Sequence, residues 1–347
     1  MSGNEKVQKR SWFSSLLPAL TLMIMAPAVA ELMSGATRLS SAFVFPLEML
    51  VWGSGAVFAR YFVRRFRLGW FNLVLLALAL AMAEELLIQQ TSFASLVVQI
   101  QHQEYGRLPV LDGAFNYVYF VWAMLYEAIL VVCVPVAIVE LMFPERRDNG
   151  WLNIWGMIPM VLLFVPASFA AWYGWNIVAR EKVFHLAPYH LPKDLALISA
   201  AVIAMTILLA VGPARRLLAG AAKPMTPPHP LVVFVLSVLA MAVVFGIEVL
   251  AFGLKPDVPT IAPVTAGIVL GLFMIWLVPA WQASPKWSTW HTIALAYGSA
   301  LGMWGLMFNG FGGGIDLYGK IGLDIFGVLV MIWIAAFALR HKSRETA

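Results

Sequence analysis

The feature that most constrains this chain is a series of long apolar runs separated by short polar breaks. A helix needs roughly 20 mostly apolar residues to cross the hydrocarbon core of a bilayer. Ten runs meet this requirement, at 12–33, 42–63, 69–89, 115–142, 152–175, 195–219, 230–253, 262–282, 290–309 and 319–340. The sequence therefore predicts an all-α, polytopic transmembrane helical bundle of about ten spans, with residues 1–347 forming a single transmembrane domain.

The composition excludes the soluble alternatives. Hydrophobic residues make up 61% of the chain and charged residues only 12%, whereas an average soluble domain is about 25% charged. There are too few polar side chains to cover a globule in water, which excludes a cytosolic enzyme, a disordered protein and a nucleic-acid binder. The single cysteine, Cys133, lies inside an apolar run, so an internal disulfide and a cysteine-built metal site are excluded.

The distribution of basic residues predicts the orientation. Cytoplasmic loops of membrane proteins carry an excess of Lys and Arg. With the N-terminus inside, 16 of the 23 Lys and Arg residues fall in inner segments, including Arg64-Arg65 and Arg146-Arg147. An even number of spans also places the basic C-terminal tail inside. We therefore expect both termini in the cytoplasm and the protein in a bilayer, most simply a bacterial inner membrane.

Two segments allow another interpretation. Ala28-Val29-Ala30 before Glu31 resembles the cleavage site of a secretory signal, although Pro27 and Glu31 also suit a retained helix, which we expect. The predicted outer segment 90–114 is too long and too apolar at its start for a plain turn. An interfacial or re-entrant segment is expected there.

Acidic residues lie inside the predicted spans, where a carboxylate costs at least about 2.5–3.5 kcal/mol on insertion scales. They are Glu31, Glu48, Glu84, Glu85, Glu127, Glu140, Glu248 and Asp324. Glu140 lies near the inner face, where Arg146 and Arg147 are expected to pair with it. Most of the others fall in the outer halves of their spans, and we expect no Lys or Arg within those spans to neutralise them. They predict an acidic cavity that opens outward, or carboxyl groups held in the protonated state.

The densest acidic group is Glu84-Glu85-Leu86-Leu87-Ile88-Gln89. Glu85 and Gln89 are four residues apart and share a helical face. Two adjacent carboxyl groups in a low dielectric cannot both ionise cheaply, so one is expected to carry a proton and to serve as a general acid or base. A bound metal or a substrate cation is the other solution, and the metal stays unknown. The sequence identifies no cofactor and no cofactor-binding residue.

A Glu-Glu pair late in a membrane helix resembles the signature of the CAAX-protease and bacteriocin-immunity superfamily of intramembrane glutamic proteases. The resemblance implies that one glutamate of the pair, together with histidines, activates water for attack on a peptide bond. Here the pair is Glu84-Glu85, Gln89 stands at the position of the motif's arginine, and the next span carries Glu127 where the family has a histidine. His291, in the ninth run, does not match the later histidine motif.

Three functions stay open. In the first, the chain is a divergent relative of the glutamic proteases with Glu84, Glu85, Gln89 and Glu127 as catalytic residues. In the second, it is a ten-span proton- or cation-coupled transporter that uses the same carboxyl groups. In the third, it is a non-enzymatic subunit of a membrane complex, in which the acids contact other membrane proteins.

Overall fold

The computed structural model describes residues 12–94, 105–111, 113–213, 215, 223–308, 311 and 313–345, and it is almost entirely helical. In the first half the elements are α1 (Trp12–Pro27), η1 (Ala28–Leu32), η2 (Leu39–Val44), α2 (Phe45–Glu48), η3 (Met49–Gly53), α3 (Ser54–Arg65), α4 (Trp70–Ala83), η4 (Glu84–Ile88), β1 (Arg107–Val110), β2 (Gly113–Asn116), α5 (Tyr117–Glu127), η5 (Ala128–Cys133), α6 (Val134–Met142) and η6 (Pro144–Arg146). The second half contains α7 (Ile154–Tyr173), η7 (Gly174–Ala179), α8 (Arg180–Lys182), α9 (Lys193–Val211), α11 (Pro230–Ala251), α12 (Ile261–Gln282), α13 (Thr289–Leu306) and α14 (Gly314–Glu345).

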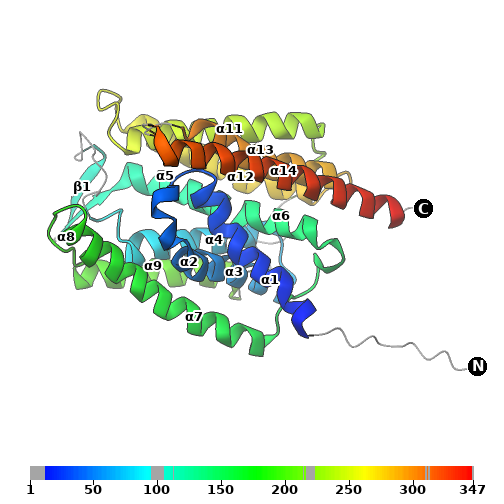
Figure 1. Ribbon diagram of the computed structural model, residues 1–347, viewed down its shortest axis with the longest axis horizontal. Helices are drawn as coiled ribbons and strands as arrows, with labels where there is room; N and C mark the ends of the chain where they lie inside the picture. The colour runs from blue at the N-terminus through cyan, green and yellow to red at the C-terminus, as the bar shows by residue number, and fades with distance from the viewer. Residues whose placement is uncertain are drawn as a thin grey trace, which may run out of the picture.

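Within the described residues, eight continuous helical stretches are long and apolar enough to cross a bilayer. They correspond to eight of the ten predicted runs. The other two runs are also helical, as α1–η1 and α13, but they do not reach the same length and hydropathy. The chain is therefore an all-α polytopic integral membrane protein. The start of α1 and the end of α14 lie at the same end of the bundle (Figure 1).

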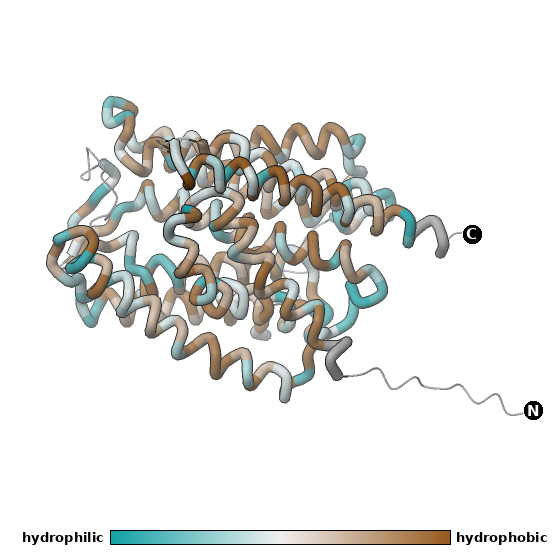
Figure 2. Tube along the Cα trace, in the orientation of Figure 1, coloured by the Kyte–Doolittle hydropathy of each residue, from teal (hydrophilic) through white to brown (hydrophobic). Residues whose placement is uncertain are grey.

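The helices divide into a buried centre and a periphery. In the stretch Tyr117–Met142, 83% of the most apolar window is buried, whereas the value is 17% for Ile261–Gln282. The peripheral helices α7, α9, α11, α12 and α14 expose large apolar side chains such as Leu162, Leu197 and Trp333. Figure 2 shows hydrophobic residues along these helices and polar residues mainly in the turns at the two ends of the bundle. Exposed apolar surface of this extent suits acyl chains as its solvent.

Several central helices contain π-helical segments. η1, η3, η4 and η5 interrupt or end the helices that begin as α1, α2, α4 and α5, and η7 does the same after α7. A π-turn inserts one extra residue into the helix, so backbone N–H groups bond five residues back, as Met33 does to Ala28 and Gln89 does to Glu84. The insertion changes which residues face the centre of the bundle.

Three features differ from the sequence expectation. The helix expected at 152–175 continues through η7 and α8 to Lys182, into the predicted outer loop. The helix expected at 195–219 ends at Val211, before Gly212. Two short antiparallel strands, β1 and β2, lie at the end of the predicted outer segment and pair Arg107 with Asn116. The Asn116 side chain accepts a hydrogen bond from the backbone N–H of Tyr119 and thereby caps the start of α5. Residues 95–104 lie outside the described residues.

The predicted inner end of the bundle is held by a buried ion-pair network. Glu140 accepts hydrogen bonds from Arg60 at 3.0 Å and from Arg64 at 2.7 Å. Arg60 also donates to the backbone carbonyls of Arg146 and Arg147. The partners of Glu140 thus come from α3, not from its nearest basic neighbours along the chain as we expected, because the long side chains of Arg60 and Arg64 reach across to α6. The two neighbouring arginines contribute their carbonyl oxygens to the same network.

Gly53 allows α1 to pack closely on η3. A Cβ atom at Gly53 would lie 2.7 Å from Met23 Cα, on the backbone of α1. Such a contact can be relieved only by moving a helix, so we expect Gly53→Ala to lower the free energy of unfolding by about 1–3 kcal/mol. Thermal unfolding in detergent micelles measures this change. Gly246→Ala on α11, where a Cβ would have open space, is the matched control, and equal melting temperatures for the two variants would contradict the close packing.

Candidate functional site

Two pairs of helices bring five glutamates together near the predicted outer end of the bundle. In the first pair, Glu31 lies in η1 and Glu48 immediately precedes η3. In the second pair, Glu84 and Glu85 open η4, and Glu127 immediately precedes η5. η3 packs on α1, η5 packs on α4, and η1 meets η5. Each glutamate is therefore placed at a π-helical segment, which is where helix geometry is most often altered for function.

The two pairs share a sequence pattern that hydropathy does not detect. Glu31-Leu32-Met33 is followed by Thr37, and Glu85-Leu86-Leu87 is followed by Thr91, so in both cases a threonine comes six residues after the glutamate. The chain leaves the helix after each π-turn and folds back. The threonine hydroxyl then reaches the glutamate of its own segment.

In the first pair, the Thr37 hydroxyl lies between two carboxyl groups. Its oxygen is 2.5 Å from Glu48 Oε1 and 3.3 Å from Glu31 Oε2. A hydroxyl has one proton to donate. Both contacts are hydrogen bonds only if one carboxyl group is protonated and donates to the Thr37 oxygen. Glu48 is 5% exposed, so its charge has no access to bulk water.

In the second pair, Glu85 has several partners. The hydroxyls of Thr91 and Ser92 donate to its Oε2 atom, the latter at 3.1 Å. The Glu85 carboxyl group is also hydrogen-bonded to that of Glu127. Two ionised carboxylates cannot form this bond because neither has a proton to donate. At least one proton is therefore held between Glu85 and Glu127.

Glu84 is the exception in the cluster. Its side chain is only 2% exposed, and neither carboxyl oxygen has a hydrogen-bond partner among the described residues. The charged groups that act on it most strongly are Glu85, Glu31 and Glu48, all of them acidic. Buried polar groups are almost always hydrogen-bonded. Glu84 is therefore a carboxyl group in the middle of the cluster with its bonding capacity unused.

Aromatic side chains close the cluster toward α5 and α11. The Tyr126 hydroxyl bonds to the carbonyl of Ala30 in η1 and lies 2.8 Å from the Ser34 hydroxyl. Glu248 of α11 is close enough to Tyr119 and Tyr126 to act on both of them electrostatically. Glu248 thus extends the acidic region onto a third part of the bundle.

Asp324 is handled differently from the glutamates, and here the sequence expectation was wrong. Its own helix carries Lys320, one turn earlier, whose ammonium lies 2.5 Å from Asp324 Oδ2. The ammonium also donates to the backbone carbonyls of Met33 at 2.7 Å and Trp304 at 3.0 Å. The i, i+4 pair thus ties α14 to the ends of η1 and α13. Its role is to join helices, and Asp324 is a neighbour of the cluster.

The other candidate residues, Gln89 and His291, have roles apart from the glutamate carboxyl groups. Gln89 closes the π-turn through its backbone N–H, which bonds to the Glu84 carbonyl at 2.8 Å. His291 caps α13, where its ring bonds to Ser288 and to the Pro228 carbonyl. Pro228 and Glu248 are about 30 Å apart along α11 by helix rise. His291 therefore lies far from the acidic cluster. Within the residues that the structure describes, no three His, Cys, Asp or Glu side chains are arranged to hold a metal ion.

Comparison with protein-family models, with curated proteins and with solved structures finds no significant match. The site must accordingly be interpreted from its own chemistry. It consists of carboxyl groups that are hydrogen-bonded to hydroxyls and to one another, beside one carboxyl group that has no partner in the part of the chain that the structure describes.

The different surroundings of Glu84 and Glu85 predict opposite effects on stability. Glu84→Met replaces an unbonded buried carboxyl with an apolar side chain of similar length, so we expect the free energy of unfolding to rise by about 1–3 kcal/mol. Glu85→Met leaves the hydroxyls of Thr91 and Ser92 without their acceptor, so the free energy of unfolding should fall by a similar amount in this variant.

Thermal unfolding of the two variants beside the wild type, in the same detergent, measures both effects. Because the residues are adjacent, each variant serves as the control for the other. A lower melting temperature for Glu84→Met than for the wild type would mean that the Glu84 carboxyl has a stabilising partner.

Proposed function

We propose that this chain is a proton-coupled membrane transport protein, in which the glutamate cluster takes up and releases the coupling protons. The observation that carries the proposal is Glu84, a buried carboxyl group that has no hydrogen-bond partner among the described residues and is influenced most strongly by other glutamates. Ionisable groups at membrane depth are costly and commonly belong to proton relays.

The bonding pattern supports protons as the bound species. The Glu31–Thr37–Glu48 contacts and the Glu85–Glu127 contact each need a proton on a carboxyl group. Glu84 lies electrostatically close to both groups. A proton that binds at the partly exposed Glu31 therefore changes the electrostatic environment of Glu84.

The π-helical segments supply a means of coupling. A π-turn is one residue away from a regular α-helix, so a small change in local energy can move the extra residue along the helix. Each glutamate of the cluster lies in such a segment or next to one. Protonation of Glu84 would change the local energy of η4 directly, because Glu84 is its first residue and its carbonyl accepts the bond that closes the turn.

A second candidate is a glutamic-protease-like hydrolase, as the resemblance of the Glu84-Glu85 helix implies. The specific observation in its favour is the hydrogen bond between the carboxyl groups of Glu85 and Glu127. Two carboxyl groups that share one proton can activate water, as in aspartic proteases. Within the described residues, the bonds of His291 lie elsewhere, at the start of α13, so water activation would depend on the glutamates.

Infrared difference spectroscopy across a pH titration tests proton binding without knowledge of the substrate. For the purified protein in lipid, we expect a protonated-carboxyl absorption that disappears as the pH rises and that is reduced in Glu84→Gln. Glutamine has no titrating proton, and its size matches that of glutamate. Glu181→Gln, at a glutamate that is about half exposed on α8, is the control and should leave this band unchanged.

Transport itself is tested in vesicles that contain the purified protein, a mixture of small metabolites outside and an imposed pH gradient. We expect at least one compound to accumulate only while the gradient is present. Glu84→Gln should abolish the accumulation. Accumulation that survives collapse of the gradient, or a carboxyl band that is identical in wild type and Glu84→Gln, would contradict the proposal.

The hydrolase alternative predicts a different result in the absence of any gradient. Membrane-spanning peptides should be cleaved by the wild type in detergent, and Glu85→Gln should lose at least about 100-fold in rate, the usual contribution of a general acid or base. Glu140→Gln is no suitable control because Glu140 holds the inner arginine network, so Glu181→Gln is used again. Cleavage at equal rates in wild type and Glu85→Gln would exclude the glutamate pair as the catalyst.

A further inference from the structure

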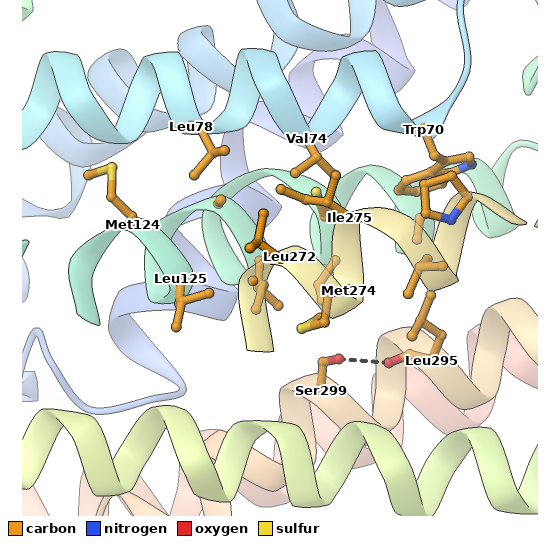
Figure 3. A pocket seen from close by; sticks show the side chains of 18 of the residues that line it. Trp70, Val74, Leu78, Met124, Leu125, Leu272, Met274, Ile275, Leu295 and Ser299 are labelled. Atoms are coloured by element: carbon orange, nitrogen blue, oxygen red, sulfur yellow. Dashed lines mark hydrogen bonds between the residues drawn. The ribbon is translucent and has the colours of Figure 1, made fainter. Parts of the chain in front are cut away.

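An apolar groove of about 340 Å³ lies beside α12 and is also lined by residues of α4, α5 and α13. Figure 3 shows side chains from all four helices pointing into it, among them Val74, Leu125, Leu272 and Ile275. Ser299 is one of the few polar residues in its lining. Its hydroxyl donates to the Leu295 carbonyl at 2.9 Å, so it offers no free donor to the groove.

Glycines on α12 shape the groove. Gly267 brings α12 onto α5, because a Cβ at that position would collide with Val121. Gly271, one turn further, keeps the space beside Leu125 open, since a Cβ there would meet only the Leu125 side chain at 3.3 Å. From Gly267 to Gln282 the groove extends about 22 Å at the helical rise of 1.5 Å per residue. One leaflet of the hydrocarbon core is about 15 Å deep, so an acyl chain fits along the groove.

A polar pocket of about 610 Å³ continues the groove at the predicted inner face. The two share Trp70, Ala137, Gln282 and Thr292 in their linings. Beyond these residues its lining includes two arginines and two acids among uncharged residues. Arg64 contacts Glu140 and Asp148 there, and Arg147 is 58% exposed. At the junction, the side-chain carbonyl of Gln282 is buried and has no partner among the described residues.

We propose that the groove and the pocket together bind one membrane phospholipid, with an acyl chain along α12 and the phosphate at Arg64 and Arg147. The apolar part opens onto α12, whose neighbouring residues Ile268 and Leu272 are at least half exposed. The charged part lies where the headgroup of an inner-leaflet lipid would be. Basic pockets between membrane helices at the cytoplasmic side are typical sites for anionic headgroups. This site is separate from the glutamate cluster and does not depend on the proposed transport.

Native mass spectrometry of the delipidated protein, titrated with phosphatidylglycerol, tests the proposal. Gly271→Leu fills the groove and Arg147→Gln removes a phosphate contact. We expect each to weaken lipid binding about tenfold, since the first displaces buried methylene groups of the acyl chain and the second removes a charge-assisted hydrogen bond to the phosphate. Gly246→Leu, in open space on α11, and Arg65→Gln, an exposed arginine that does not line the pocket, are the matched controls and should bind as the wild type does.

Each alternative occupant gives a distinct result. Glycerol 3-phosphate carries the same phosphate chemistry without the chain, and full displacement of the lipid by it would mean that the groove contributes nothing. Equal binding by Gly271→Leu and Gly246→Leu would overturn the proposal, as would a second copy of the chain released from the groove by the lipid. If Gly271→Leu does not fold, Ile275→Trp fills the same groove and is measured in its place.

Discussion

The cost of placing carboxyl groups inside a bilayer controls the arrangement of this bundle. An unpaired charge at membrane depth costs several kcal/mol, and the chain carries acidic residues in most of its central helices. Each must find a cation, a hydroxyl or a proton. The choice among these three differs from one acid to the next, and that difference separates structural acids from the candidate site.

At the inner end the acids are neutralised by cations. Glu140 is held by two arginines of α3, and one of them also satisfies carbonyls in the following turn. Breaking such a network would leave a buried charge uncompensated, so it fixes α3 against α6. Both oxygens of Glu140 accept hydrogen bonds from Arg64, so little of its chemistry is left over for binding or catalysis. Lys320 and Asp324 form a similar ion pair between α14 and its neighbours, but nearer the glutamates.

At the outer end the glutamates are hydrogen-bonded to hydroxyls and to one another. This arrangement needs the carboxyl groups to converge from four helical segments, which a regular α-helix with these sequences would not achieve. The π-turns rotate the residues that follow them. Two of them, η1 and η4, also end the helices that begin as α1 and α4, and the chain then folds back through Thr37 and Thr91. A helical irregularity is therefore what assembles the site.

Hydropathy predicted the helices well and the contacts poorly. The ends of α11 and α12 agree with the predicted runs within about two residues, because a membrane span has a length set by the bilayer. α13 is a helix with much of its surface buried, yet it is less apolar than the rest, since its small residues pack against α11. The convergence of Glu48 with Glu84, and of Arg60 with Glu140, depends on packing between distant segments and on π-turns, neither of which has a hydropathy signal. The threonine six residues after both Glu31 and Glu85 is the one feature of the sequence that indicates the hydroxyl partners of these glutamates.

The repeated pattern also identifies the position where the two helix pairs differ. Glu31 and Glu85 are equivalent, and so are Glu48 and Glu127, each placed just before a π-helical segment. All four have hydrogen-bond partners. The residue before Glu31 is Ala30, whereas the residue before Glu85 is Glu84. The one acid that the repeat does not require is thus the one whose oxygens have no partner among the described residues. Hydrogen bonds account for the positions of the four paired glutamates, whereas none from the described residues reaches the carboxyl group of Glu84. This difference is why the proposed proton coupling is assigned to Glu84.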